Sequence, residues 1–154
     1  MSGLLEQLLA EEAELQFDQL GHEDALALGL KLLERVRRDR LPVVIEVTLA
    51  GLTVLHCALP GSRPDNEDWV RRKRNTVSRF WHSSFYMGRY YATKGTSLAD
   101  KPHIAPSEFV DHGGSFPLLV RGLGCVGSIS VSGLAQEEDH ALLVGVLREW
   151  RASR

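Results

Sequence analysis

The residue that most clearly points to chemistry is a lysine that helical spacing directs inward. Apolar residues recur every three or four positions over residues 65–81, and Lys73 falls in the middle of that stripe with Arg74 at its border. A buried ammonium without a counter-charge is costly. Three outcomes stay open: the side chain snorkels to the surface, it meets an internal carboxylate, or it meets an anionic ligand.

The placement of the basic residues argues against nucleic-acid binding. A helix that binds RNA or DNA displays its cations on one exposed face, whereas the cations of residues 71–74 surround an apolar stripe. The formal net charge of −2 gives no general attraction to nucleic acid or to acidic lipid. No apolar run approaches the roughly 20 residues of a membrane span. We therefore expect neither nucleic acid nor a membrane as a partner.

Two glycine-containing turns are the second feature with chemical potential. One is His112-Gly113-Gly114, which precedes a predicted strand, and the other is Ser132-Gly133, which ends a predicted strand. Consecutive amides in the first turn form either an anion-binding nest or simply a tight turn, and both interpretations stay open. No G-x-S-x-G elbow accompanies this turn, so serine hydrolysis is excluded.

Between the two turns, Gly122, Gly124 and Gly127 match the dinucleotide fingerprint G-x-G-x-x-G. That fingerprint requires a following helix, because the helix amides hold the pyrophosphate. Here residues 128–132 alternate with β-branched side chains and predict a strand. We interpret the first two glycines as a hairpin turn, and Gly127 as a position that another backbone or a ligand approaches closely.

A ligand-binding pocket is predicted where the inward lysine faces the two turns. Its candidate residues are Lys73, Arg74, His82, His112, Gly113, Gly114, Ser132, Asp139 and His140. His112 is also the candidate catalytic residue, as a general acid–base. A metal site is not expected, because the chain has no His-x-x-x-His or Cys-x-x-Cys pair.

Periodicity predicts the elements that hold these residues. Helices are expected over residues 1–15, 22–38, 65–81 and from about 136, with a short helix after His82. Strands are expected over residues 43–49, 52–59, 117–121 and 125–132, with a short fifth strand at 15–18. Together they predict a single α/β (α+β) domain over residues 1–154. Its sheet is mixed, largely antiparallel and of about five strands, with flanking helices mainly on one face.

The turn Ala50-Gly51 sets the expected register of the first hairpin. Leu49 then faces Leu52, and His56 lies opposite Ile45 on the main apolar face, as a core histidine. Both faces of this hairpin are apolar, so another subunit is expected to cover the second face. The leucine-rich helix over residues 1–15 either lies on the domain or contacts a neighbouring subunit.

Composition predicts a cytoplasmic protein. The 154 residues are 44% hydrophobic and 25% charged, as is ordinary for a globular domain. Cys57 and Cys125 lie in predicted strands and are best explained as small apolar side chains in a reducing compartment. Residues 1–15 carry four glutamates and no basic residue, unlike a signal or transit peptide.

Several sequence blocks resemble the GlcG/HbpS superfamily, described as haem-degrading or haem-binding. The blocks are Gly-Gly-x-Phe-Pro-Leu-x-Val from Gly113 and Gly-x-Ile-x-Val-Ser-Gly from Gly127, with residues 59–61, 64–66 and 71–77 resembling one branch that has no settled activity. The resemblance runs from about Asp18 to Trp150. It implies a profilin-like three-layer fold, a homodimer or higher oligomer, and haem as a candidate cofactor.

Three hypotheses for function remain open. In the first, the chain is a small-ligand-binding domain directed to haem or to a small carboxylate. In the second, it is an oligomeric scaffold or adaptor that binds other proteins. In the third, it is an enzyme that acts on a small anionic metabolite and uses His112 as its acid–base.

Overall fold

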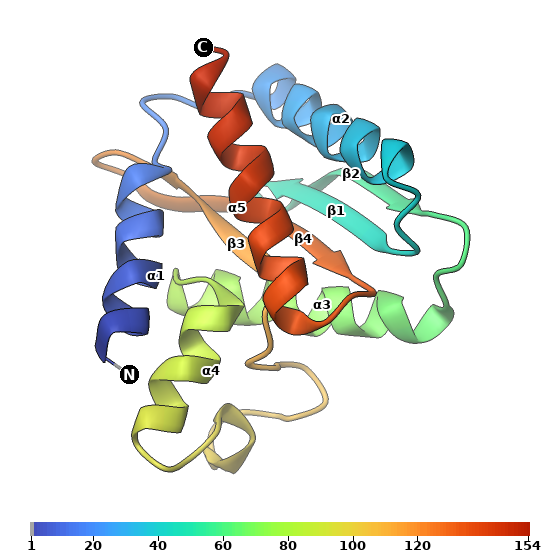
Figure 1. Cartoon of the computed structure of the whole chain (residues 1–154). Coiled ribbons are helices and arrows are strands. Elements are labelled where there is room, and N and C mark those ends of the chain that lie inside the picture. The colour runs from blue at the N-terminus through green and yellow to red at the C-terminus, as the bar shows by residue number, and fades with distance from the viewer. Residues whose placement is uncertain (1) are drawn as a thin grey trace.

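The computed structural model of the chain describes residues 2–154. The helices are α1 (Ser2–Glu14), α2 (His22–Arg38), α3 (Pro64–Phe80), α4 (Ser84–Thr93) and α5 (Gln136–Ala152), with a 3-10 turn η1 (Leu98–Asp100). The strands are β1 (Val44–Leu49), β2 (Leu52–Ala58), β3 (Ser115–Val120) and β4 (Gly124–Ser132). These elements confirm the predicted α+β fold (Figure 1).

The sheet consists of two antiparallel hairpins joined side by side, in the order β2-β1-β4-β3. The prediction of about five strands was too high by one. At the expected fifth strand a single residue, Phe17, forms a parallel bridge with Val120, and its amide donates to the Leu119 carbonyl at 2.8 Å. The chain turns away into α2 before a second residue can pair.

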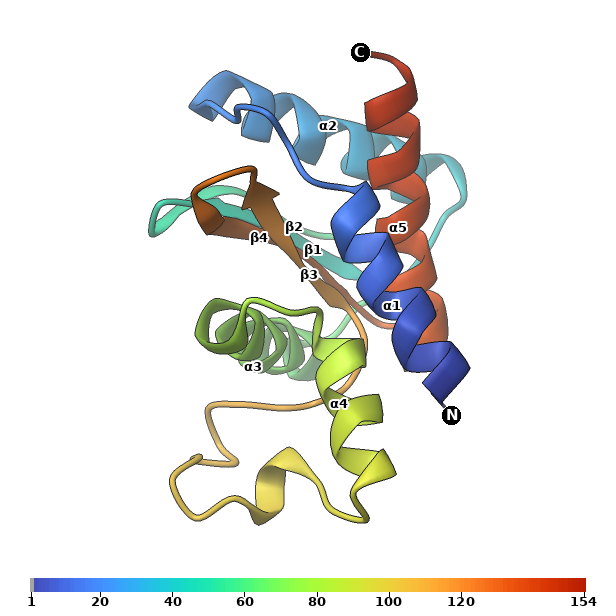
Figure 2. The same cartoon turned by 90° about the vertical axis from the view of Figure 1, so that its left-hand side faces the viewer.

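Helices cover both faces of the sheet, which gives three layers (Figure 2). Helices α2 and α5 lie on one face, and α3 lies on the other. The prediction that helices pack mainly on one face was therefore wrong, and the chain itself covers the face that was expected to need another subunit. Helices α1 and α4 lie beside the sheet and contact each other.

The main core lies between the sheet and the α2–α5 layer. Fully buried side chains from both layers interdigitate there, among them Leu28, Ile45, Ile129 and Leu143. Gly29 lets α2 approach the sheet, because a Cβ at this position would lie 3.1 Å from the Cβ of Leu55. Glycine at this position therefore permits close packing of α2 on the sheet.

A β-bulge in the first hairpin moves His56 to the face opposite the one predicted. Leu49 pairs with Leu52 as expected, but the register shifts between Val47 and Thr48. His56 therefore pairs with Glu46 instead of Ile45. Because one extra residue in a strand reverses every side chain beyond it, His56 faces α3 and not the apolar core.

Gly127 marks a close approach of two backbones. A Cβ there would overlap the carbonyl oxygen of Thr48 on β1. The sequence allowed either another backbone or a ligand to lie close to Gly127. The structure shows that the backbone of β1 lies there. The returning segment is strand β4 and not a helix, which confirms that the three glycines are no dinucleotide fingerprint.

We predict that Gly127→Ala destabilises the chain by roughly 1–3 kcal/mol, because the strands must separate to admit the methyl group. Gly145→Ala is the matched control: no atom lies within 4 Å of a Cβ at this helical position. That substitution should stabilise the chain by up to about 1 kcal/mol through helix propensity. Urea denaturation measures both. An unchanged midpoint for Gly127→Ala would contradict the close approach.

Candidate functional site

Lys73 is buried and meets an internal carboxylate. It belongs to the stripe of α3 that packs on the sheet, and 3% of the residue is exposed. Its Nζ lies 3.1 Å from Asp139 Oδ2 and 3.3 Å from the Val131 carbonyl oxygen. Of the three outcomes that the sequence left open, snorkelling is wrong, and the internal carboxylate is the one observed.

Burial penalises both charges of this pair. Asp139 lies in the first turn of α5 with 1% exposure, and its Oδ1 accepts from the Leu134 amide at 3.1 Å. Burial raises the pKa of Asp139 to about 6, although Lys73 and nearby backbone amides oppose the shift. Burial also lowers the pKa of the Lys73 ammonium, against the opposing effect of Asp139. The two groups are therefore both shifted toward their neutral forms.

A small cavity of about 190 Å³ opens beside Lys73, and we call it the Lys73 hollow. It lies between α3, the loop before β3, the end of β4 and the start of α5. Its lining residues are Asn66, Trp69, Lys73, His112, Ser132, Gly133, Leu134 and Gln136. The structure thus brings Lys73, His112 and Ser132 together in the space between the basic helix and the two glycine turns.

Gly113 and Gly114 lie next to the Lys73 hollow, between His112, which lines it, and the start of β3. The Gly113 amide donates to Gln136 Oε1 at 2.9 Å, so it is used within the chain. Gly114 has a φ of +134°, and a Cβ there would lie 2.6 Å from Lys73 Nζ. Glycine at this position therefore leaves the room that the ammonium occupies.

His112 is exposed and stacks against Trp69, with ring centroids 5.2 Å apart. Burial lowers the pKa of His112, which Asp111 opposes and Lys73 reinforces. The imidazole is consequently neutral at pH 7 and can donate or accept a proton. The guanidinium carbon of Arg72 also lies over the Trp69 ring, 4.5 Å from its centroid.

Three predicted site residues lie away from the Lys73 hollow. Arg74 reaches toward the sheet and contacts both carboxylate oxygens of Glu46, at 3.0 and 3.1 Å. The reason is helical geometry, since one residue beyond Lys73 is rotated by about 100°.

His82 and His140 are the other two predicted site residues that lie away from the Lys73 hollow. Each of them contacts a glutamate of α1. His82 Nδ1 lies 2.7 Å from Glu12, whose hydrogen bond raises the pKa of His82. His140 Nε2 lies 2.9 Å from Glu11. Helix α1 therefore lies on the domain, and it docks through two buried acids, Glu11 and Glu12.

Five of the eight lining residues were not among the predicted site residues, and helical spacing contained the signal for two of them. Trp69 and Asn66 precede Lys73 by four and seven residues, so all three share one face of α3. Gln136 is the first residue of α5 and follows the Ser132-Gly133 turn directly. No local pattern marks its side chain as part of a site.

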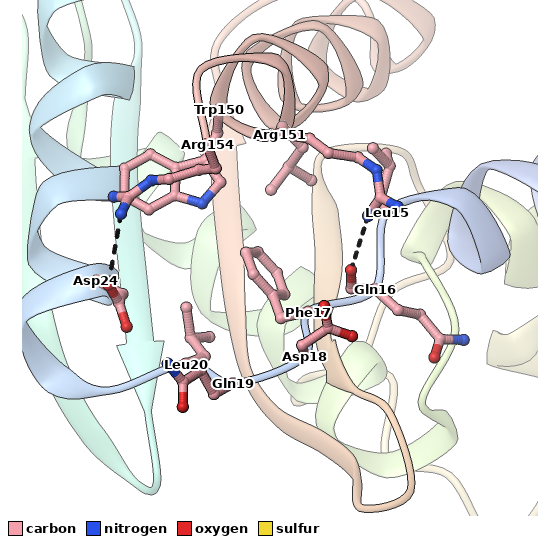
Figure 3. Close-up of a pocket in the computed structure, with 11 residues that line it drawn as sticks. Leu15, Gln16, Phe17, Asp18, Gln19, Leu20, Asp24, Trp150, Arg151 and Arg154 are labelled. Carbon is pink, nitrogen blue, oxygen red and sulfur yellow. Dashed lines mark hydrogen bonds and ion pairs between the residues drawn. The ribbon is translucent and has the colours of Figure 1, made fainter.

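A larger hollow of about 510 Å³ lies at the other end of α5, beside residues 15–20 (Figure 3). Phe17, Leu20 and Trp150 give it an apolar floor. The Arg154 guanidinium lies 3.7 Å from the Trp150 ring centroid, and Arg151 donates to the Gln16 carbonyl at 3.0 Å. Its charged residues are exposed or half-buried, so the Lys73 hollow, with two buried charges, is the candidate site.

Two general properties concern residues 2–154 only. Within this range no three His, Cys, Asp or Glu side chains are grouped so that they could hold a metal ion. Over the same range no helix has both the length and the apolar character needed to cross a membrane.

The raised pKa of Asp139 predicts how stability depends on pH. The folded pKa of about 6 exceeds the unfolded value of about 3.9. The folded chain therefore binds this proton more tightly, and the contribution of Asp139 to stability falls as pH rises from about 4 to 6. Asp139→Asn removes this ionisation. Its unfolding free energy relative to wild type should rise by roughly 1–3 kcal/mol between pH 4 and pH 7.

Glu14→Gln is a control of opposite sign, measured by urea denaturation over the same pH range. Glu14 forms an exposed pair with Arg148 at 3.0 Å, and its hydrogen bond to Arg148 lowers the pKa of Glu14. The free energy of unfolding of wild type should therefore rise slightly relative to that of Glu14→Gln as pH rises through the acidic range. Parallel pH profiles for wild type and Asp139→Asn would contradict the raised pKa.

The chain is similar over nearly its whole length to known proteins. A family model described as "Haem degrading protein HbpS-like" matches residues 20–148. A UPF0303 protein of Streptomyces coelicolor is 42% identical over 144 residues, which is 94% of this chain and 91% of the relative. The crystal structure of the Ybr137w protein superposes with a TM-score of 0.86 at 32% identity, covering 97% of this chain and 88% of that chain.

A more distant structure, titled as a complex of PduOC with haem, has a TM-score of 0.66 at 19% identity. It covers 79% of this chain and 87% of that chain, and at this identity it shows likeness of fold alone. The family match and the close relatives agree with the resemblance that the glycine-turn blocks suggested. The chain belongs to the HbpS-like family.

Proposed function

We propose that the chain binds a small organic anion, a carboxylate of a few carbon atoms, in the Lys73 hollow. The observation that carries this proposal is a buried ammonium on the wall of a cavity whose other polar groups are mainly hydrogen-bond donors. An ammonium has three donor hydrogens, and Asp139 and Val131 take two of those on Lys73. The third remains for a ligand.

The side-chain amides of the hollow are oriented as donors. The oxygen of Asn66 accepts from the Arg63 amide at 2.9 Å, and the oxygen of Gln136 accepts from the Gly113 amide at 2.9 Å. Each side chain therefore keeps its NH₂ group for other partners. With the hydroxyl of Ser132 and the ammonium of Lys73, these groups form a set of donors suited to a carboxylate.

The size of the hollow limits the ligand. Its volume of about 190 Å³ is below the roughly 300–1,000 Å³ of sites for drug-sized molecules. Trp69 and Leu134 provide apolar wall on which a short carbon chain can pack. A carboxylate with few non-hydrogen atoms satisfies both the volume and the donor set.

Haem does not fit this hollow. A porphyrin is larger than a drug-sized ligand and needs a broad apolar slot, whereas the Lys73 hollow is small and lined largely by polar side chains. His112, the histidine at the hollow, packs its ring against Trp69 and has no such slot in front of it. The proposed ligand is therefore a small carboxylate, although the family is named for haem.

Thermal denaturation with a panel of acetate, propionate, pyruvate, succinate and haem tests this proposal. At 100 times its Kd a ligand stabilises the folded chain by about 2.7 kcal/mol, which corresponds to a rise in Tm of roughly 5–10 °C. We expect such a rise for at least one carboxylate with wild type. Lys73→Met and Ser132→Ala should reduce it strongly.

The matched control is Lys94→Met, which removes an exposed lysine on α4's C-terminal side. It should leave the rise in Tm unchanged. A rise that persists in Lys73→Met, or the absence of a rise for every carboxylate, would contradict the proposal. A haem effect that depends on His112 would contradict the exclusion of haem from this hollow.

We also propose that the chain self-associates, because a separate surface favours it. Three large apolar side chains, Leu52, Trp81 and Leu123, are 59%, 50% and 68% exposed. Trp81 has a left-handed backbone with φ of 61° and packs against Gly124, so its ring is fixed at the end of the sheet where both hairpins turn. Trp81 also lines a hollow at this end of the sheet. Exposed apolar side chains grouped at one end of a sheet are typical of a protein contact.

Light scattering coupled to size-exclusion chromatography tests self-association. We expect wild type to elute as a multiple of 17.1 kDa. Leu123→Ser should weaken association at least about tenfold, since burying a leucine contributes roughly 1.5–3 kcal/mol. Leu30→Ser, which changes a 51%-exposed leucine on α2, is the control and should not alter the mass. A wild-type monomer at high concentration would contradict the proposal.

A further inference from the structure

We propose that Lys73 reacts covalently, forming an imine with the carbonyl carbon of a small 2-oxo acid held in the Lys73 hollow. This inference rests on the proposed function, because the oxo acid is one member of the class of small carboxylates. It adds a ligand class and a bond-forming step at the Nζ atom. The observations that carry it are the placement of the amine, its proton partner and the donors around it.

The surroundings of Lys73 favour the free amine that such a reaction requires. A lysine attacks a carbonyl only when its nitrogen is unprotonated. Burial lowers the pKa of the Lys73 ammonium, and Arg72 on the same helix lowers it further, while Asp139 opposes the shift. His112 is the other titratable group at the hollow and is neutral at pH 7.

The other three lysines of the chain lack these surroundings. They are Lys31, Lys94 and Lys101, and each is exposed or half-buried. Lys73 is therefore the one buried amine among the described lysines, and it also lines a cavity. If Lys73 reacts, it should therefore be modified selectively among the four lysines. A purely structural ion pair with Asp139 would give no such selectivity.

Asp139 is placed to carry the protons of the reaction. Its Oδ2 lies 3.1 Å from Lys73 Nζ, within hydrogen-bond distance. Because its pKa is raised to about 6, it can both accept and return a proton near neutral pH.

The step balances without any further reagent. The lone pair of Nζ forms a C–N bond to the carbonyl carbon, and the nitrogen passes one of its two protons through Asp139 to the carbonyl oxygen, which gives a carbinolamine. The nitrogen then passes its second proton through Asp139 to the hydroxyl group as the C–O bond breaks and water leaves. The products are the imine and one water molecule, and nothing is oxidised or reduced.

A 2-oxo acid matches the hollow better than a simple aldehyde does. Its carboxylate finds donors in Ser132, Asn66 and Gln136, while its carbonyl carbon lies one bond away from that carboxylate. Anchoring the carboxylate therefore brings the carbonyl within reach of the amine. The volume of about 190 Å³ limits the acid to a few carbon atoms.

Reductive trapping tests the imine directly. Full-length wild-type protein is incubated at pH 7 with pyruvate and sodium cyanoborohydride, which reduces an imine to a stable secondary amine. Peptide mass spectrometry then measures the extent of modification at each of the four lysines. We expect Lys73 to be modified roughly tenfold or more faster than the others, since each unit of lowered pKa yields tenfold more free amine.

The variants separate chemistry from binding. Lys73→Arg keeps a cation but cannot form the imine, so trapping at this position should vanish. Asp139→Asn removes the proton acceptor and should slow trapping roughly a hundredfold. Propionate, which has no ketone, is the matched ligand, and it should raise the Tm without forming an adduct.

Each outcome decides between the two proposals. If propionate and pyruvate raise the Tm but Lys73 is modified no faster than the surface lysines, the imine is wrong and the binding site stands. If Lys73 is modified selectively and Asp139→Asn slows the reaction, the inference holds. If neither acid binds nor reacts, both proposals fail. The comparison among lysines of wild type remains informative even if a variant does not fold.

Discussion

The interaction on which this structure depends is the buried pair of Lys73 and Asp139. Helix α3 lies under the sheet and α5 above it, and the two charges meet at the end of β4, beside the carbonyl of Val131. This contact crosses all three layers. Gly114 lacks the side chain that would occupy the position of the ammonium, so the glycine turn and the charge pair require each other. The Lys73 hollow exists because these elements converge there without filling the space.

Local patterns in the sequence were sufficient for much of this arrangement. Counting 100° per residue placed Lys73 on the inner face of its helix, and the structure shows it 3% exposed. Strand alternation after Gly127 distinguished a hairpin from a nucleotide-binding turn, and β4 follows as predicted. The same count would have added Trp69 and Asn66 to the site. Such features could be predicted because each depends on residues within one or two turns of the chain.

What could not be predicted depends on partners that are distant in the sequence. Glu11 and His140 lie 129 positions apart, and nothing near either residue shows that the acid is buried against the imidazole. One bulged residue in the first hairpin reverses His56, because strand periodicity is exact only while pairing is regular. The expected fifth strand shrinks to Phe17 for a related reason: its length is set by where β3 lies and where α2 begins.

The direction of the pKa shifts, together with the position of Lys73 on the Lys73 hollow, supports the proposal that the Lys73 pair serves chemistry. In the surface pair of Glu14 and Arg148, hydrogen bonding lowers the pKa of the acid and raises that of the base, so each partner favours the charged form of the other. In the buried pair both shifts are reversed, because desolvation outweighs mutual attraction. Apolar side chains of similar volume would join α3 to α5 without that cost. An amine and an acid displaced toward neutrality, beside a cavity rich in donors, are instead what proton transfer and attack on a carbonyl require.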